Sequence, residues 1–511
     1  MSLSVRLAGY NVDAELLQDV LLLLRELESG GASGDAMISV ATLRALAEMA
    51  KTNLPADAFT PETISAAYAR ISRDPKHVTE LRRAARMGVA RARKSNESII
   101  FGLGHASVAE HAAFNFDVSG ISRLASEELQ SHRLLSFTEK SQRYITISAE
   151  YVVPPEVVGT PHEMLFHEAV PELFQAYDEI TSALTTRYVP GDATELSKQE
   201  TRDLENRAKE DARYLLPLAC STQMGMTMNA RNVEHVALEL SDHPLQEVRE
   251  LGAAIATAVG SLAPSLVKYT VRGQFPRENR RILAGMITRS AVTRASDTMQ
   301  NGPRVRLVDM TPDGETKILR ALAFSSSDFP AGEKSFSTAS HVWKTALRNL
   351  SPHDSVLREF EMASMTFEAE VSASCFAQLK RHRMMTLLSQ PYDADASVVV
   401  PPSIQDAGLT AKFMTAVERS RQAARTLAEV YPLLMPYLLT NAHVKRVLIH
   451  ANARELYHFA RLRCDAHAQW EIRLLGEQVM ELARREWPNV FSLACGKDHF
   501  ETAYQKLFPE T

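Results

Sequence analysis

Apolar and polar side chains follow strand-like and helix-like patterns that occur twice along the chain. Residues 5–11 (VRLAGYN) and 305–311 (VRLVDMT) are short runs with β character, and each leads through polar residues into a stretch of helical period. Residues 114–118 and 365–369 alternate apolar and polar side chains, which predicts strands with one buried face. The two halves therefore begin alike.

The rest of the chain is patterned mainly as helix, for example at 16–24 and 444–462. We predict an α+β fold of two repeated domains, each a modest sheet covered by helices. The domains are placed at 1–300 and 301–511. The first contains an insertion at about 29–60 that includes the turn SGGASG, and a basic linker at about 275–303 joins the two.

Short motifs recur in the same order in both halves. His-Arg pairs at 132–133 and 382–383 are each followed by a Val-Pro-Pro segment, and then by Asn-Ala-Arg at 229–231 and 452–454. Each Asn-Ala-Arg motif opens a predicted helix, with Gln246 and Gln469 further along at positions taken as equivalent. Order and spacing preserved over the whole length indicate a tandem duplication.

Composition narrows the possible function classes. A chain of 511 residues fits two cores better than one, and a net charge of −5 gives no footprint for nucleic-acid binding. The four cysteines are widely spaced, so neither a disulfide framework nor a zinc site is expected. No apolar run reaches membrane-spanning length and no secretory leader is recognisable, so we expect a cytoplasmic protein with no membrane or nucleic-acid partner.

Two charged segments are candidates for binding an anion. Arg381, His382 and Arg383 form a dense cationic cluster that could hold phosphate or a flavin edge, although such triplets usually lie on solvated helix faces. Glu139, Ser141 and Arg143 alternate at a spacing of two, which in an extended loop would project them to one side. The alternative for that loop is a polar surface turn.

The helices opened by Asn-Ala-Arg carry further candidates. Asn452 and Arg463 lie about three turns apart and share a face, and Arg454 and His458 are neighbours at i and i+4. The first half keeps the equivalent polar residues but has an apolar residue in place of Arg463: Asn229, Arg231, His235 and Leu240. Only the second helix can therefore place a cation at that position.

The segment GHASVAEH at 104–111 contains two histidines, but it does not predict a metal site. His105 and His111 lie six residues apart, on different faces of a helix, unlike the i, i+4 pair of a zinc helix. Ser107 is expected either to contact a cofactor or to cap a helix.

These motifs together resemble the flavin-dependent thymidylate synthases. The resemblance rests on GHASVAEH at 104–111, GISR at 120–123, His132-Arg133 with Ser141 and Arg143-Tyr144, RHR at 381–383, and NAR at 452–454 through AQWEIR at 468–473. It implies reductive methylation of dUMP to dTMP, with bound FAD, with NADPH as reductant and with methylenetetrahydrofolate as carbon donor. It also implies that carbon transfer runs through the flavin without a cysteine nucleophile, so Ser141 is a binding group.

The family builds its site from two subunits, and this chain divides the parts between its halves. The residues that one family subunit supplies match Gln378, Arg381 and Arg463 of the second half. The residues that the other subunit supplies match Glu139, Ser141, Arg143 and Arg213 of the first half. Each half lacks the residues that the other half keeps. In the first half, Glu128, Ser131 and Leu240 stand at the positions of Gln378, Arg381 and Arg463. In the second half, the positions of Glu139, Ser141, Arg143 and Arg213 are occupied by Ser389, Pro391, Asp393 and Pro436. The resemblance therefore implies one composite site between the repeats, with Arg463 as the catalytic residue that favours N3-deprotonated uracil.

The implied flavin contacts also come from both halves. They are Ser107 and Glu139 from one half, Arg381, His382 and Arg383 from the other, and either Asn229 and Arg231 with His235 or Asn452 and Arg454 with His458. Four family protomers per tetramer imply a homodimer of the fused chain. Two alternatives stay open: a flavin-dependent C5 methylase or hydroxymethylase of another pyrimidine nucleotide, and an inert flavin or nucleotide sensor.

Overall fold

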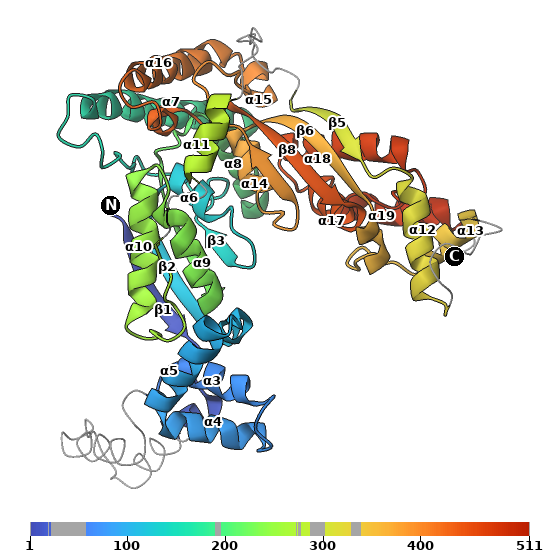
Figure 1. Cartoon of the computed structure of the whole chain (residues 1–511). Coiled ribbons are helices and arrows are strands. Elements are labelled where there is room, and N and C mark those ends of the chain that lie inside the picture. Colours follow the sequence, from blue (N-terminus) through green and yellow to red (C-terminus); the bar gives the residue numbers. More distant parts are fainter. Residues whose placement is uncertain are drawn as a thin grey trace, which may run out of the picture. The chain divides into compact units, whose positions relative to one another are not determined.

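The computed structural model describes residues 2–18, 20–21, 58–189, 196–271, 273, 277–286, 302–328 and 339–509. The chain divides into two compact units (Figure 1). The first consists of Met1–Lys140, Pro154–Glu156 and Ser221–Ser290, and the second of Ser141–Val153, Val157–Cys220 and Ala291–Thr511. The second unit thus contains an arm from the first half of the sequence, at 141–220, together with the second half.

The first unit contains a four-stranded antiparallel sheet in the order β1-β2-β4-β3. Its strands are β1 (Ser4–Tyr10), β2 (Ala113–Ser122), β3 (Ser136–Glu139) and β4 (Ser221–Asn229). Its helices are α3 (Glu62–Arg70), α4 (Val78–Met87), α5 (Val89–Glu97), the π-turn η1 (Ser98–Gly102), the 3₁₀ turn η2 (Ala106–His111), α6 (Arg123–Leu129), α9 (Ala230–Ser241), α10 (Gln246–Gly260) and α11 (Arg277–Met286). Phe114, Phe116 and Val118 point inward from β2, because alternate side chains of a strand face the same side.

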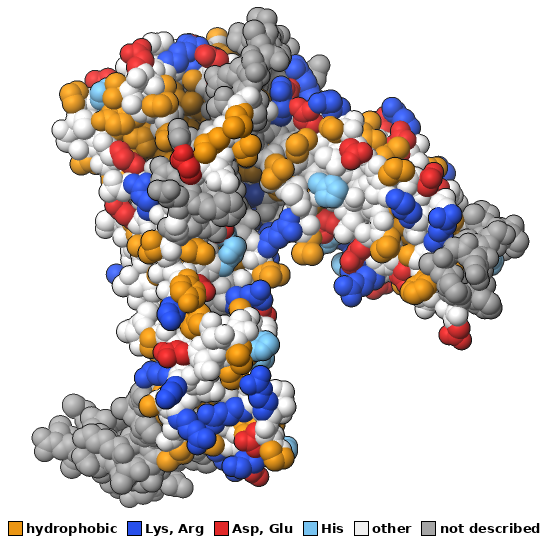
Figure 2. All heavy atoms as spheres, in the orientation of Figure 1, with side chains coloured by type: hydrophobic (Ala, Val, Ile, Leu, Met, Phe, Trp, Pro, Cys, Tyr) orange, Lys and Arg blue, Asp and Glu red, His pale blue; other side chains and the backbone are white. Residues whose placement is uncertain are grey.

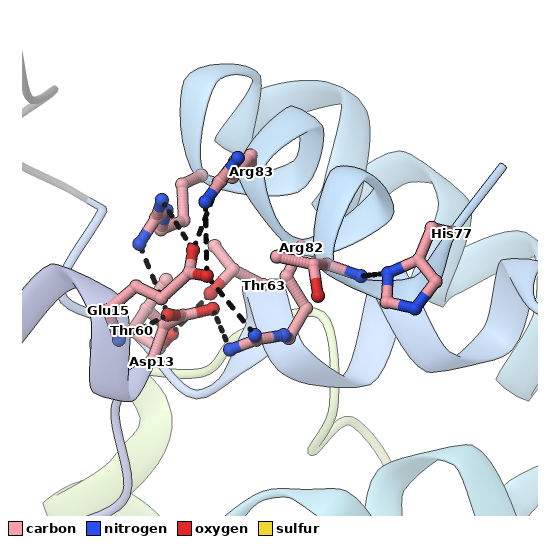
Figure 3. A network of polar contacts seen from close by, with 9 residues as sticks. Asp13, Glu15, Thr60, Thr63, His77, Arg82 and Arg83 are labelled. Carbon is pink, nitrogen blue, oxygen red and sulfur yellow. Dashed lines mark hydrogen bonds and ion pairs between the residues drawn. The ribbon is translucent and has the colours of Figure 1, made fainter.

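An ionic network joins the residues after β1 to α4 (Figure 3). Asp13 accepts hydrogen bonds from Arg82 Nη1 and Arg86 Nη1, both at 3.1 Å, and Glu15 accepts one from Arg83 Nε at 3.1 Å. The hydrogen bond from Arg83 lowers the pKa of Glu15. Other basic side chains of this region face solvent, and Figure 2 shows Lys and Arg gathered over α4 and α5.

The second unit contains a sheet of the same topology, in the order β5-β6-β8-β7. Its strands are β5 (Arg304–Met310), β6 (Ser364–Ser372), β7 (Thr386–Ser389) and β8 (Val444–Asn452). Its helices from the second half are α12 (Gly314–Ser325), α13 (Ala339–Leu347), the 3₁₀ turn η5 (Arg358–Met362), α14 (Ala373–Leu379), α15 (Pro402–Asp406), α16 (Thr410–Ala428), the 3₁₀ turn η6 (Met435–Leu438), α17 (Ala453–Arg463), α18 (Trp470–Glu486) and α19 (Lys497–Leu507). The first half contributes α7 (Glu163–Tyr188), α8 (Lys198–Ala212) and the 3₁₀ turn η4 (Arg213–Leu215).

The two sheets are copies of one another and confirm the predicted α+β fold. The strands predicted at 5–11, 305–311, 114–118 and 365–369 are β1, β5, β2 and β6. The copies differ by a bulge in β2 at Gly120, where φ is +70° and a Cβ would lie 2.3 Å from the carbonyl oxygen of Ser2. Only glycine fits that close approach of backbones.

The first-half arm and the second half pair through a local two-fold arrangement inside the second unit. Leu218 N–H donates to Leu439 C=O at 2.8 Å, and the symmetry-equivalent Asn441 N–H donates to Leu216 C=O at 2.9 Å. A second reciprocal pair runs from Ala219 to Tyr437 and from Ala442 to Tyr214. Within this unit, equivalent segments of the two repeats therefore face each other as two subunits of a dimer would.

One sequence prediction is wrong and others fall outside the description. Residues 444–452 form strand β8 instead of the start of a helix, because Val447, Ile449 and Ala451 alternate into the core and the helix begins only after Asn452. Helix is present at 14–18 and 20–21, whereas 22–24, most of the insertion at 29–60, and the domain boundary near 300 lie outside the described residues. Helix α11 lies within the segment predicted as the linker.

Two kinds of feature are absent from the described residues. No helix there is long and apolar enough to cross a bilayer. No group of three or more His, Cys, Asp or Glu side chains is arranged there to hold a metal ion.

Candidate functional site

The cluster at 381–383 follows a short helix in the second unit. Ser372 caps α14 by accepting the Cys375 N–H at 3.0 Å, and the chain turns after Leu379. The turn leaves Arg381 exposed, buries His382 and half-buries Arg383. One turn of backbone therefore presents two arginines on either side of a buried imidazole.

Arg463, the last residue of α17, contacts this cluster directly. Its Nε donates to His382 Nε2 at 2.8 Å, and its Nη2 donates to the carbonyl oxygen of Gln378 at 3.2 Å. Burial, followed by the charges of Arg381 and Arg143, lowers the pKa of Arg463 to about 10. The guanidinium remains charged at neutral pH, in a setting where several cations converge.

His382 is held as a neutral acceptor. Burial, then the charges of Arg463 and His458, lowers the pKa of His382 well below its usual range. Since Nε2 accepts from Arg463, the proton belongs on Nδ1, which lies 3.6 Å from Glu455 Oε1. Burial also raises the pKa of Glu455. The imidazole thus orients Arg463 without adding charge.

The arm from the first repeat brings further cations to the same unit. Arg143 lies close enough to Arg463 to lower its pKa, and its Nε is paired with Glu210 of α8. Arg213 is 6% exposed, and its carbonyl oxygen accepts from Asn441 Nδ2 at 3.0 Å. The first-half candidates Arg143 and Arg213 and the second-half candidates Arg381 and Arg463 therefore belong to one compact unit.

A cavity of about 790 Å³ opens beside Arg143. Its lining combines arginines, carboxylates and aromatic rings, including Arg143, Arg207, Glu210, Asp211 and Trp470. Asp211 is buried there and accepts from Ser403 Oγ at 2.6 Å and from Trp470 Nε1 at 3.0 Å. Burial raises the pKa of Asp211 to about 6.

The remaining sequence candidates of the second unit lie around this cluster. Asn452 caps α17 by accepting the Glu455 N–H at 2.9 Å, and the His458 ring lies 5.7 Å from that of His382. Arg454 instead donates to the Val356 carbonyl oxygen at 3.0 Å and to Glu361 at 2.8 Å.

In the first unit, the position equivalent to Arg463 carries a leucine. Leu240 is buried at the position of Arg463, and His132 directs Nδ1 to the Leu129 carbonyl oxygen at 3.1 Å. Its ring lies 6.0 Å from that of His235, as His382 lies near His458. The arrangement of helix and histidines is therefore similar in the two copies, while an arginine stands at this position in the second copy and a leucine in the first.

The other first-half candidates lie in the first unit. Glu139 ends β3 and accepts hydrogen bonds from Ser126 Oγ and Gln130 Nε2, both at 2.9 Å, and is paired with Arg123. Ser107 is exposed in η2, where it makes no capping hydrogen bond, so the helix-capping alternative is wrong. Asn229 caps α9, and the exposed Arg231 pairs with Glu110.

Two further expectations need correction. Residues 142–144 form a turn in which Ser141 Oγ accepts the Arg143 N–H at 3.1 Å, so the segment from Glu139 to Arg143 is not extended. Gln246 and Gln469 are also not equivalent, because Gln469 is the N-cap of α18 whereas Gln246 is the first residue of α10. Counted from the equivalent residues Leu240 and Arg463 to the first residue of the next helix, the chain is one residue longer before α18 than before α10.

Comparison with known families agrees with the duplicated fold. The family described as "Thymidylate synthase complementing protein" (Thy1) matches residues 54–265 and 306–489. The chain belongs to the Thy1 family. Because the two matched segments contain the equivalent strands β2 to β4 and β6 to β8 of two sheets with the same topology, the chain is a tandem repeat of the Thy1 fold.

Individual Thy1 relatives fall into two kinds. A protein named flavin-dependent thymidylate synthase from Clostridium tetani is 32% identical over 213 residues, covering 41% of this chain and 82% of the relative. A UPF0159 protein from Chlamydia muridarum is 24% identical over 457 residues, covering 83% of this chain and 85% of the relative. Among solved structures, a UMP/dUMP methylase, PolB, from Streptomyces cacaoi aligns with a TM-score of 0.33 at 18% identity over 41% of this chain and 96% of its own, a likeness too weak to bear on fold or substrate.

The Thy1 motifs led to most of the cations of the cluster, but not to the groups that hold them. Glu210 pairs with Arg143 and Tyr214 accepts from Gln469, yet a lone Glu or Tyr in a helical stretch gives no sequence signal. For Gln469 the available signal was the extra residue before α18, which moves it to a capping position.

Proposed function

We propose that this chain is a flavin-dependent thymidylate synthase, which converts dUMP to dTMP at a composite site formed by the two Thy1 repeats. One observation carries the proposal. Arg143 and Arg213 of the first repeat belong to the same compact unit as Arg381 and Arg463 of the second, and each of the repeats has lost the complementary set.

The cationic cluster suits a phosphate-bearing substrate. Arg143, Arg213 and Arg381 would bind the nucleotide phosphate by charge-assisted hydrogen bonds, with Ser141 and Gln378 as neutral partners. Because Arg143 is paired with Glu210 in this structure, the phosphate would have to share or replace that carboxylate. Five groups from two repeats would thus orient the uracil ring relative to Arg463.

Arg463 has the properties that uracil activation requires. A buried guanidinium lowers the pKa of a neighbouring acid, so it would favour removal of the N3 proton and raise electron density at C5. His382 fixes the orientation of that guanidinium through its Nε2. Ser141, whose hydroxyl accepts the Arg143 N–H, would bind substrate without forming a covalent bond to it.

The residues of the second unit also fit FAD. Arg383 Nη1 is buried and has no hydrogen-bond partner among the described residues, so a donor is available for an anionic ligand beside Arg381 and His382. Within the second unit the His458 ring lies 5.7 Å from that of His382, and Asn452 and His458 would complete the contacts. Arg454 of the same helix, and Ser107, Glu139, Asn229 and Arg231 of the first repeat, are further candidates. FAD when bound would supply the redox chemistry, with NADPH as reductant and methylenetetrahydrofolate as the one-carbon donor.

The repeat architecture suggests the assembly. Since the two repeats already pair in a dimer-like arrangement at 214–219 and 437–442, a homodimer of the chain would supply four Thy1 units. Light scattering of the purified protein tests this, and a mass corresponding to a monomer would reject it.

The deciding experiment measures the flavin and the product together. The purified chain should be yellow, be bleached by NADPH faster when dUMP is present, and form dTMP once methylenetetrahydrofolate is added. Formation of dTMP from dUMP, but not of a methylated product from UMP or dCMP, is expected. A flavin that is reduced yet never reoxidised in the presence of both substrates would overturn the proposal in favour of a sensor.

A further inference from the structure

A chain of buried hydrogen bonds connects the first-repeat arm with Gln378. Gln378 Nε2 donates to Gln469 Oε1 at 3.3 Å, and Gln469 Nε2 donates to Tyr214 Oη at 2.8 Å. Tyr214 Oη in turn donates to Glu471 Oε2 at 2.5 Å. Tyr214 and Glu471 are fully buried and Gln469 is 1% exposed, so water cannot substitute for a missing partner.

Tyr214 anchors the Nε2 end of the Gln469 amide. The phenol accepts from the Gln469 NH₂ group, which leaves Oε1 to accept the Glu471 and Ile472 N–H groups, at 3.1 and 3.3 Å, as well as Gln378. Burial and the neighbouring Glu471 raise the pKa of Tyr214 far above its usual range, so the hydroxyl keeps its proton and donates. A phenyl ring at this position would leave the buried Gln469 NH₂ group without the acceptor that the Tyr214 hydroxyl supplies.

This series of hydrogen bonds ends at Gln378, one of the residues proposed to bind the nucleotide. Arg463 Nη2 donates to the Gln378 carbonyl oxygen at 3.2 Å, and Gln469 closes the loop of five residues that follows Arg463. Ser372 N–H and Oγ donate to Glu471 at 2.9 and 2.5 Å, which anchors the far end on the strand that leads into α14. A displaced Gln469 would therefore release both Gln378 and the loop after Arg463.

In the first repeat, the equivalent series of hydrogen bonds lacks the two glutamines. Helix α10 begins after Leu245, whose side chain makes no capping hydrogen bond, and Glu128 replaces Gln378. Ser122 and Glu247 keep their hydrogen bonds, at 2.6 and 2.7 Å. The tyrosine itself is kept, because Tyr437 occupies the position of Tyr214 and is equally buried. Gln469 is therefore found only in the copy that keeps Gln378 and Arg463. The serine–glutamate hydrogen bonds and the buried tyrosine are common to both copies.

We propose that Tyr214 is a positioning residue for the nucleotide: through Gln469 it holds Gln378 and the loop after Arg463 in the geometry that binds dUMP. The first repeat would thus contribute to the site a buried hydroxyl that does not touch the substrate, in addition to its arginines. This inference rests on the proposed function.

The test compares Tyr214→Phe with Tyr437→Phe in the full-length holoprotein. Each change deletes one buried hydroxyl at equivalent positions, so both should cost similar stability in a urea titration. Tyr214→Phe should raise the dUMP Kd, measured by equilibrium dialysis, and the KM for dUMP by about tenfold, with kcat within about threefold of wild type. Tyr437→Phe should leave Kd and KM unchanged.

A second variant protects the test against misfolding. Gln469→Leu copies the residue that caps α10, and it should raise the KM for dUMP about as much as Tyr214→Phe. The double variant should be no worse than either single one, because both act through the same link.

The outcomes separate the two proposals. Equal effects of the two Phe variants on KM, no effect of Tyr214→Phe, or additive effects in the double variant would overturn the positioning role while leaving the synthase intact. A wild-type chain that binds dUMP but never forms dTMP would overturn the proposed function, while the Kd comparison would still decide the positioning role. A wild-type chain that does not bind dUMP would overturn both.

Discussion

Arg463→Leu provides the sharpest test of the proposal that the second repeat supplies the catalytic cation of the composite site. The substitution copies Leu240, which occupies the same position in the first repeat. The two positions pack alike, because a Cβ added to Gly252 would lie 2.7 Å from the Leu240 Cβ, and one added to Gly476 would lie 3.3 Å from the Arg463 Cβ. Leucine is therefore accommodated at the equivalent helix–helix contact of the first repeat, and we expect it to fit at Arg463.

The expected change in stability is small because two terms oppose each other. Keeping Arg463 charged at a pKa of about 10, against a usual value above 12, costs about 3 kcal/mol at roughly 1.4 kcal/mol per factor of ten in proton affinity. Leucine removes that cost. It also leaves His382 Nε2 and the Gln378 carbonyl oxygen without their donor, at about 1 to 3 kcal/mol each. The free energy of unfolding should therefore change by no more than about 3 kcal/mol.

The activity should fall much more than the stability does. Loss of a preorganised cation at a site of developing charge typically costs about 10²- to 10³-fold in kcat, so tritium release from 5-tritiated dUMP and dTMP formation should both fall by that factor. Binding of dUMP should persist, weakened, through Arg143 and Arg213. Arg461→Leu is the matched control, since Arg461 lies on the same helix, contacts the Asp354 carbonyl oxygen, and should keep activity within about threefold.

The reasoning fails if Arg463→Leu turns over at a rate comparable to wild type while remaining folded. It fails equally if Arg461→Leu loses as much activity, because the effect would then belong to α17 as a whole.

Three other perturbations have definite expected results. Ser141→Ala should raise the KM for dUMP about fivefold with kcat nearly unchanged, and complete loss of turnover would instead indicate a covalent role. Asp211 has a pKa raised to about 6 by burial, so the folded state binds its proton more tightly and stability should fall as pH rises from about 4 to 6. Asp211→Asn keeps an acceptor for Trp470 and should remove that pH dependence in urea unfolding at pH 4.5 and 7.5; an unchanged pH profile would contradict it. Gly252→Ala should destabilise by about 1 to 3 kcal/mol, because its Cβ would clash with Leu240, and an unchanged thermal midpoint would refute the packing argument.

The first-repeat arm is the part of the fold that no sequence pattern indicated. Chain order alone assigns 141–220 to the first half, yet this segment packs with the second half in one compact unit. Its partners are reached through contacts such as Tyr214 to Glu471, separated by 257 residues. Periodicity reports which face of an element is apolar, but it carries no information on which distant element covers that face.

The periodicity of residues 444–462 also failed to distinguish strand from helix. The run reads as one helix because its apolar residues are dense enough to satisfy either period, and the strand β8 is fixed by pairing with β6 and β7. Asn452 marks the true start of α17 because its side chain accepts the Glu455 N–H.

The sequence by itself determined that the chain is a duplicated Thy1 α+β protein, and that each repeat keeps the residues which the other has lost. Those conclusions depend only on the identity and the order of the residues, which the amino-acid sequence contains directly. Tertiary structure alone decided that Arg143 lies close to Arg463, that Asp211 is buried with a raised pKa, and that Tyr214 fixes Gln469 behind Gln378. Burial and electrostatic coupling arise from distances between segments far apart in sequence, and packing sets those distances.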